Sequence, residues 1–142
     1  MKKAAIALAA LSLVAFLPSC TKKKTNTISG KIEIAPLLGR LPIRQSAALY
    51  LIAHAAGDAS GPPIAVKRFT PPFHFPITFT LSSQDEMIPD VPFDGPFDIS
   101  VRLAQSGSAT PSAKGDFEGS AEPGPVQLGS KDVEIRLARV RQ

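Results

Sequence analysis

The sequence predicts an all-β domain, an antiparallel β-sandwich, that follows an N-terminal export signal. Fourteen prolines are spread through the 142 residues. Each proline removes a backbone hydrogen-bond donor and disfavours a helical conformation in the residue before it. Between the prolines lie short segments in which apolar and polar residues alternate, which is typical of strands with one buried face. We therefore expect several short strands and no long helix.

Four segments alternate clearly and predict strands. Isoleucine, phenylalanine, valine and leucine occupy every second position, and polar residues occupy most positions between them, within residues 28–34, 77–81, 97–103 and 133–137. Residues 64–69 predict a fifth strand. In each segment the apolar side chains share one face, and that face is expected to form the core.

The segment 47–56 is ambiguous between helix and strand. Ala48, Leu51 and Ile52 lie at a spacing that would form one stripe of a helix. Tyr50 and the β-branched Ile52, however, favour a strand. We interpret the segment as a strand because a lone short helix would be an odd neighbour for so many alternating segments.

Turn residues separate the predicted strands. Glycine and proline are concentrated at 57–63, 71–72 and 92–96, and the longest irregular region, 105–125, is rich in serine, glycine, alanine and proline. Strands at this spacing, with no alternation of strands and helices, imply an antiparallel sandwich of the Ig-like or transthyretin-like type. We expect it to comprise residues 28–142.

Residues 1–19 have the features of a secretory signal peptide. Lys2 and Lys3 form a charged start, and the segment 4–17 is apolar apart from Ser12. The apolar segment is too short to cross a hydrocarbon layer of about 30 Å. It therefore predicts export rather than a permanent transmembrane anchor.

The segment Leu17-Pro18-Ser19-Cys20 resembles the lipobox of bacterial lipoproteins, although Pro18 replaces the small residue expected there. The chain has a single cysteine, so the alternative is an ordinary cleaved signal with a chance cysteine. Two or three acyl chains on Cys20 would hold the mature protein on a membrane essentially permanently. Residues 20–27 then form a lipidated tether, and Thr21, in place of the aspartate that commonly retains lipoproteins in the inner membrane, favours the outer membrane.

The positive charge of the chain is concentrated at its N-terminus. The formal net charge is +4, but Lys2 and Lys3 leave with the signal, and Lys22, Lys23 and Lys24 follow Cys20. The remaining body is nearly neutral, which argues against nucleic-acid binding. The three lysines of the tether are suited to contacts with lipid headgroups.

No motif predicts catalysis or metal binding. His54 and His74 have no partner at a metal-ligand spacing, and a soft copper site that combined Met87 with a histidine would rest on unclustered ligands. A GxSxG elbow is absent, and the adjacent Asp85 and Glu86 point apart in a strand or turn. We expect no catalytic residue, no metal and no cofactor, and hence a binding or scaffolding module.

The order of motifs from Ile28 onward resembles the C-terminal periplasmic domain of the c-type cytochrome biogenesis factor CcmI, also called CycH or the CcmH tail domain. The most specific part is Ser-Gly-Ser-Ala-Thr-Pro at 106–111 followed by Gly-Asp-Phe-Glu-Gly at 115–119. The other matching segments are 28–30, 48–56, 63–68, 75–81, 85–87, 101–105 and 129–133.

The resemblance implies a role beside the haem-ligation machinery, with that machinery or apocytochrome c as the partner. The family's transmembrane helices and helical repeats have no counterpart in this sequence, so we expect a free-standing accessory lipoprotein that faces the periplasm. It would bind protein partners without turnover, in c-type cytochrome biogenesis or in assembly of a respiratory complex. The alternative is a generic envelope lipoprotein whose sandwich binds a peptide, a glycan or a partner subunit.

We expect the contact surface to lie in the region 105–125, because loops on a rigid sandwich commonly carry recognition. The residues assigned to it are Ser106, Gly107, Thr110 and Asp116.

The lipid anchor is directly testable. Protein extracted from membranes is expected to begin at Cys20 and to carry the mass of its acyl chains in mass spectrometry. A Cys20→Ser variant should carry no acyl mass and should leave the membrane fraction. An unmodified mature mass in the unsubstituted protein would contradict the prediction.

Overall fold

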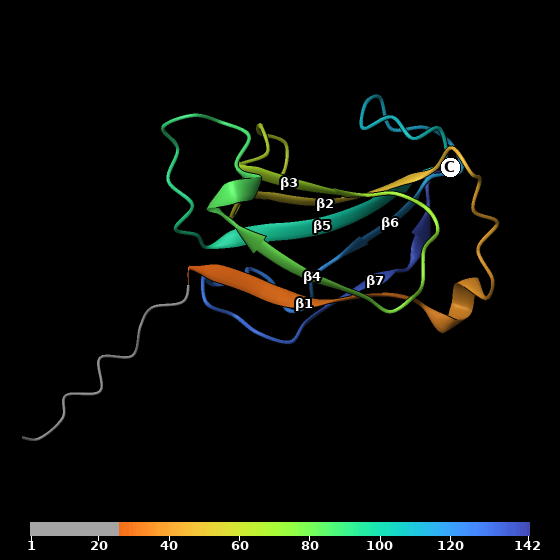
Figure 1. The fold of residues 1–142 in the computed structure, drawn as a ribbon, viewed down its shortest axis with the longest axis horizontal. Coiled ribbons are helices and arrows are strands. Elements are labelled where there is room, and N and C mark those ends of the chain that lie inside the picture. The colour runs from red at the N-terminus through yellow and green to blue at the C-terminus, as the bar shows by residue number, and fades with distance from the viewer. Residues whose placement is uncertain (1–25) are drawn as a thin grey trace, which may run out of the picture.

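The structure is a computed structural model that describes residues 26–142, and Cys20 and the predicted signal peptide lie outside this range. Its strands are β1 (Thr27–Ile34), β2 (Ala48–Ala55), β3 (Ala65–Phe69), β4 (Ile77–Ser82), β5 (Phe97–Ala104), β6 (Phe117–Ser120), β7 (Val133–Leu137) and β8 (Arg139–Val140). Two short 3-10 turns, η1 (Pro36–Leu38) and η2 (Ser83–Asp85), follow β1 and β4 (Figure 1).

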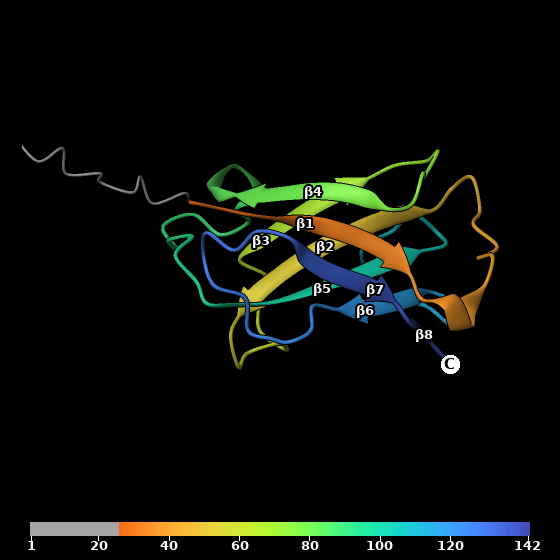
Figure 2. The ribbon, with the colours of Figure 1, turned by 90° about the horizontal axis from the view of Figure 1, so that it is seen from below.

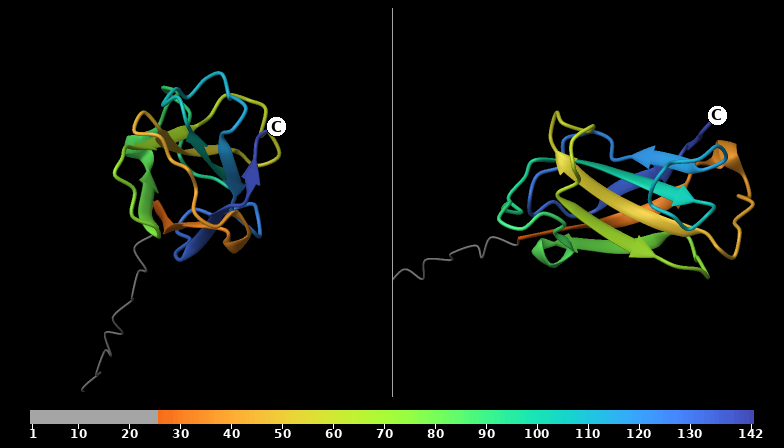
Figure 3. Two further views of the ribbon diagram at one scale, coloured as in Figure 1. Left: turned by 90° about the vertical axis from the view of Figure 1, so that its right-hand side faces the viewer. Right: turned by 90° about the horizontal axis from the view of Figure 1, so that it is seen from above.

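The strands form two sheets packed face to face, which confirms the predicted β-sandwich. One sheet has the order β4-β1-β7 and the other the order β3-β2-β5-β6-β8. Figure 2 shows the three strands of the smaller sheet side by side, and the end view of Figure 3 shows the two layers. The prediction of purely antiparallel pairing is wrong at one place, because β1 and β7 are parallel. Alternation of apolar residues shows which face of a strand is buried but not the direction of its neighbour.

The ambiguous segment 47–56 is a strand, β2, as predicted. Its Leu49, Leu51 and Ala53 face the core, whereas Tyr50 belongs to a second apolar cluster with Ala48 and Ala104. Both faces of this strand are therefore apolar near its start. This is the physical reason why its sequence did not alternate.

The region 105–125, predicted to be irregular throughout, contains β6. The correction has a simple cause, because the strand is only four residues long and Gly119 occupies one of its two inward positions. A Cβ atom at Gly119 would collide with the backbone carbonyl of Arg136. The close approach of β7 thus requires the residue that weakens the strand signal. The two-residue strand β8 gave no sequence signal either.

The core is the space between the two sheets. The ring of Phe93, from the loop before β5, stacks on Phe97 with 4.6 Å between ring centroids. The largest apolar side chains that are fully buried are Phe97, Ile28, Ile32, Leu49, Leu51, Leu81, Leu103, Ile135, Leu137 and Val101. Burial of each large side chain stabilises the fold by about 1.5–3 kcal/mol.

The two long sides of the sandwich differ. On one side β7 approaches β6, where Ala121 pairs with Ile135 and the Ala138 amide donates to the Glu118 carbonyl at 3.0 Å. On the other side the Lys67 ammonium of β3 donates to the Thr80 carbonyl of β4 at 2.7 Å. A backbone bridge between Ala65 and Glu86, with the Met87 amide donating to the Ile64 carbonyl at 2.8 Å, also joins this second side near its N-terminal end. Both sides are therefore linked by backbone pairing, and the second has a side-chain link as well.

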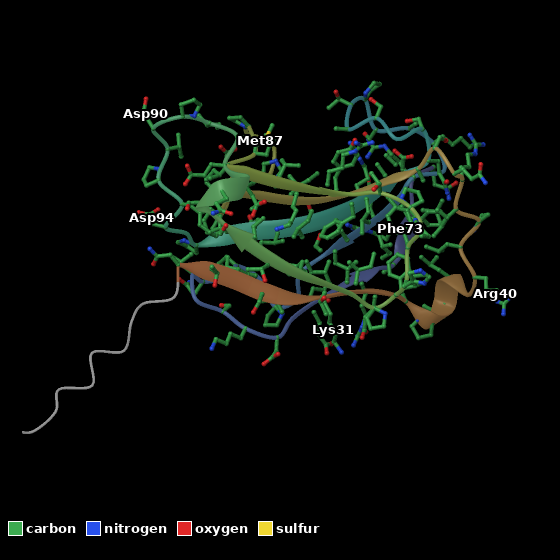
Figure 4. All side chains as sticks on the ribbon, viewed as in Figure 1. Lys31, Arg40, Phe73, Met87, Asp90 and Asp94 are labelled. Atoms are coloured by element: carbon green, nitrogen blue, oxygen red, sulfur yellow. The ribbon has the colours of Figure 1, made fainter. Side chains whose placement is uncertain are left out.

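The loops gather at two opposite ends, which we name by the course of the chain. The N-terminal end, where β1 begins, carries the loops 56–64, 83–96 and 121–132. The distal end carries the loops 35–47, 70–76 and 105–116. Figure 4 shows the labelled Asp90 and Asp94 at the first end and Arg40 and Phe73 at the second. This separation decides which residues can act together.

Two leucines form a matched test of the fold. Leu51→Ala, at a fully buried position, is expected to lower the free energy of unfolding by about 2–5 kcal/mol, because it removes packed methyl groups and leaves a cavity. Leu37→Ala, at a position that is 98% exposed, should change it by less than about 0.5 kcal/mol. Urea denaturation of both variants measures the difference, and equal effects would contradict the buried position of Leu51.

Candidate functional site

The side chain of Gln105 ties two loops of the distal end together. Its Nε2 donates to the Pro42 carbonyl at 2.8 Å, and its Oε1 accepts from the Arg44 amide at 3.1 Å. Its backbone carbonyl accepts from the Ser46 hydroxyl at 2.9 Å. Loops 35–47 and 105–116 therefore form one cross-linked surface rather than two independent flaps.

Asp116 lies beneath that surface and is only 1% exposed. Its Oδ1 accepts a hydrogen bond from the backbone amide of Gln105 at 3.0 Å, and its Oδ2 accepts one from the backbone amide of Ala113 at 2.9 Å. This placement corrects the assignment of Asp116 to the contact surface, since a buried carboxylate that fixes backbone amides cannot face a partner. The assignment followed from the position of Asp116 in the irregular region 105–125, and a local sequence pattern does not show that a carboxylate in such a region is buried.

Gly107 holds the same loop against the outer face of the larger sheet. Its carbonyl accepts from the Tyr50 hydroxyl at 2.7 Å, and its φ of +79° lies in the region that favours glycine. A Cβ atom at Gly107 would also collide with the Ser46 carbonyl. The loop covers Tyr50, which explains why this outward-facing side chain is buried.

Ser106 and Thr110 are exposed, and we call the segment 106–110 the crest of the loop. The Ser106 hydroxyl accepts from the Ser108 amide at 3.3 Å, and the Ser108 hydroxyl donates to the Thr110 carbonyl at 2.7 Å. The crest is thus held by its own hydrogen bonds while its side chains face solvent. Of the four predicted contact residues, these two present side chains at the surface.

The larger sheet also carries a row of arginines across its outer face, which sequence reasoning missed. Cross-strand pairing aligns one residue from each of its five strands. In order from β3 to β8, the aligned residues are Arg68, Tyr50, Arg102, Glu118 and Arg139. We call the three arginines of this line the arginine row.

The arginine row has no carboxylate partner among residues 26–142. The one acidic residue in line with it, Glu118, is bound by Arg141 at 2.9 Å. The Nε of Arg102 is enclosed by protein and has no acceptor there. The row is therefore a set of guanidinium groups whose charge is not neutralised within the described part of the chain.

The outer face of the smaller sheet is different, because its charges are paired. The Lys31 ammonium contacts Glu33 at 2.9 Å and Glu134 at 3.1 Å, and Arg136 contacts Glu134 at 3.0 Å. The hydrogen bond to Glu33, followed by that to Glu134, raises the pKa of Lys31, and the bond from Lys31 lowers the pKa of Glu33. Lys31 is labelled on this face in Figure 4.

One small pocket gathers polar side chains at the N-terminal end of the larger sheet. His54, Asp98, Ser100 and Ser120 line it, in a volume of about 240 Å³. No hydrogen bond joins these four side chains in the described residues, and Asp98 instead accepts from the Gly57 amide at 2.9 Å. The pocket thus lacks the hydrogen bond between base and nucleophile that activates a serine.

Metal-ligating side chains are not clustered in the part of the chain that the structure describes. No group of three histidine, cysteine or acidic residues lies close enough to hold a metal. His74 lies in the distal loop 70–76, whereas Met87 lies at the N-terminal end (Figure 4). His74 is therefore at the opposite end of the sandwich from Met87. His54 lies toward the same end as Met87, but it belongs to no cluster of three histidine, cysteine or acidic residues in the described part of the chain.

Asp116 offers a test of how the loop is held. Asp116→Ala is expected to lower the free energy of unfolding by about 1–3 kcal/mol, because two amides lose their acceptor. Hydrogen exchange of the backbone amides of Gln105 and Ala113 should become faster at the same time. The exposed Asp94→Ala is the control, and unchanged exchange at both amides in Asp116→Ala would contradict this role.

Comparisons with known proteins bear on the whole domain. Within residues 26–142, no helix has the length and apolar character needed to cross a bilayer. Searches of curated proteins and of solved structures gave no match. A family model, described as the Ig-like domain of cytochrome c-type biogenesis protein H, matches residues 28–138. The match runs from β1 to the end of β7, and the chain therefore belongs to the family of cytochrome c-type biogenesis protein H Ig-like domains.

Proposed function

We propose that this protein is a non-catalytic accessory lipoprotein of c-type cytochrome biogenesis, which binds a protein partner through its distal loops. The family match supports the process. The proposed mode of action rests on one observation: Gln105 and Asp116 hold loops 35–47 and 105–116 together as one fixed surface. The partner would be apocytochrome c or a component of the haem-ligation machinery.

The geometry of the distal loops suits recognition of a protein. A loop that is already ordered loses little conformational freedom on binding, so more of the contact energy appears as affinity. The crest around Ser106 and Thr110 presents small side chains and backbone groups, which allow a partner to approach closely. Catalysis would require an activated nucleophile or a metal, and the described residues present neither arrangement.

The proposed anchor fits this orientation. A lipid on Cys20 would attach the domain through the N-terminal end, where β1 begins (Figure 1). The distal loops lie at the other end of the strands and would face away from that membrane. We propose that the domain faces the periplasm, where c-type cytochromes receive haem, with the outer membrane favoured as its anchor site.

The contact surface is tested by adding bulk without charge. In Ala109→Tyr/Thr110→Tyr, two exposed side chains at the crest become large, and covalent haem attachment to c-type cytochromes in the native host is expected to fall severalfold. The matched control Ala59→Tyr/Ser60→Tyr adds the same bulk to exposed positions in the N-terminal loop 56–64. Haem staining of the cytochromes and immunoblotting of the variant are the measurements.

The control should retain normal haem attachment. Normal attachment with the crest variant, at normal protein level, would overturn the proposed contact surface. Equal loss with both variants would show that bulk anywhere on the domain is harmful, and it would also overturn the assignment.

A further inference from the structure

We propose that the arginine row is a binding site for an acidic protein segment. The proposal rests on the proposed function in one respect, namely that the domain has a protein partner, and it adds the chemistry of that partner. Arg68 and Arg139 are exposed, and Arg102 is half-buried between them. Tyr50 and Glu118 occupy the intervening strands.

The spacing of the row suits carboxylates on one segment. Neighbouring strands lie about 4.8 Å apart, so successive arginines, two strands apart, are separated by about 10 Å. The row runs across the strands and not along one of them, because its members are cross-strand partners. A segment that lies across the sheet and presents carboxylates at this repeat can engage all three guanidinium groups.

The chemistry of the row favours a carboxylate ligand. A guanidinium group donates two parallel hydrogen bonds to a carboxylate, in a geometry that an ammonium cannot match. The partly buried stem of Arg102 restricts its side chain before a ligand arrives, which lowers the entropic cost of binding. Beside the row, Ile52 and Val66 are partly exposed and pack against the apolar cluster of Ala48, Tyr50 and Ala104. They offer apolar contact to a segment that carries carboxylates.

The charge distribution of the whole domain favours the same partner. The exposed charges in the three loops of the N-terminal end are mostly acidic, and Lys131 is the one exposed cation in the loops described there. The exposed acidic residues are Asp58, Glu86, Asp90, Asp94, Glu122 and Asp132. The exposed cations of the distal end include Arg40, Arg44, Lys114 and Arg141. An acidic partner is therefore attracted to the arginine row and the distal end and repelled from the opposite end.

The same distribution argues for a protein and against a lipid surface. If the chain is anchored through Cys20, its own membrane lies at the N-terminal end, and the tether lysines Lys22, Lys23 and Lys24 are the cations placed to meet its headgroups. The row faces sideways from the larger sheet and does not face that membrane (Figure 1). The expected occupant of the row is therefore a protein segment.

Binding of oligoglutamate to the purified domain tests the proposal, with oligoglutamine as the neutral probe. Oligoglutamate should bind and oligoglutamine should not. Arg68→Gln/Arg139→Gln removes two exposed charges of the row and is expected to raise the dissociation constant roughly tenfold. The matched control Arg40→Gln/Lys131→Gln removes two exposed charges that lie in loops outside the row and should leave it nearly unchanged. Both variants keep Arg102, so folding should be preserved, as thermal unfolding will show.

Three results would overturn the proposal. They are no binding of oligoglutamate, equal weakening by both double variants, and binding of phosphatidylglycerol vesicles or polyphosphate in preference to oligoglutamate. The outcome is separable from that of the proposed function. If the crest variant loses haem attachment and the domain does not bind oligoglutamate, the proposed function stands and the proposal that the arginine row is a binding site falls. If the domain binds oligoglutamate and the crest variant keeps normal haem attachment, the arginine row stands as a binding site and the proposed contact surface falls.

Discussion

The pairing of β2 with β5 at the centre of the larger sheet is the constraint on which the rest of the structure depends. Their antiparallel register places Leu51 opposite Val101 on the core side and Tyr50 opposite Arg102 on the outer side. A slip of one residue would exchange the two faces of a strand. It would bury Arg102 in the core and expose the leucines. The cost of such an exchange fixes the register, and the register then fixes both the core and the arginine row.

The distal loops are ordered by hydrogen bonds rather than by a core of their own. Asp116 supplies two acceptors and Gln105 supplies contacts to three different residues. Each such bond adds only about 0.5–1.5 kcal/mol, but at Asp116 the loss of these bonds would leave a buried carboxylate without its partners. The loops therefore hold one arrangement with few apolar contacts. This is how a segment rich in serine, glycine and proline becomes a fixed surface.

The two outer faces of the sandwich have different electrostatic characters. On the smaller sheet, Lys31 and Arg136 are paired with Glu33 and Glu134, and the face is nearly neutral. On the larger sheet, the arginine row has no such partners in the described residues. Because exposed ion pairs add little to stability, leaving the exposed Arg68 and Arg139 unpaired costs the fold little. The enclosed Nε of Arg102 has no acceptor, and this does cost stability. The three arginines are free to serve an interaction with another molecule, in keeping with a family named for cytochrome c-type biogenesis.

The sequence by itself determined the strands with regular alternation and the class of fold. Ile28, Ile32, Leu81, Ile135 and their neighbours alternate with polar residues, and this local pattern depends only on which face is buried. It also excluded long helices through its prolines. The resemblance in the motifs at 106–111 and 115–119 led to the family that the comparison then gave.

Only the tertiary structure decided the features that depend on non-local contacts. The parallel pairing of β1 with β7, the strand β6 with its inward Gly119, and the burial of Asp116 each depend on a segment distant in the chain. The arginine row has the same origin, because Arg68, Arg102 and Arg139 belong to different strands and meet only through their register. Local alternation fixes which face of a strand is apolar. It carries no information about which distant residue will lie beside it.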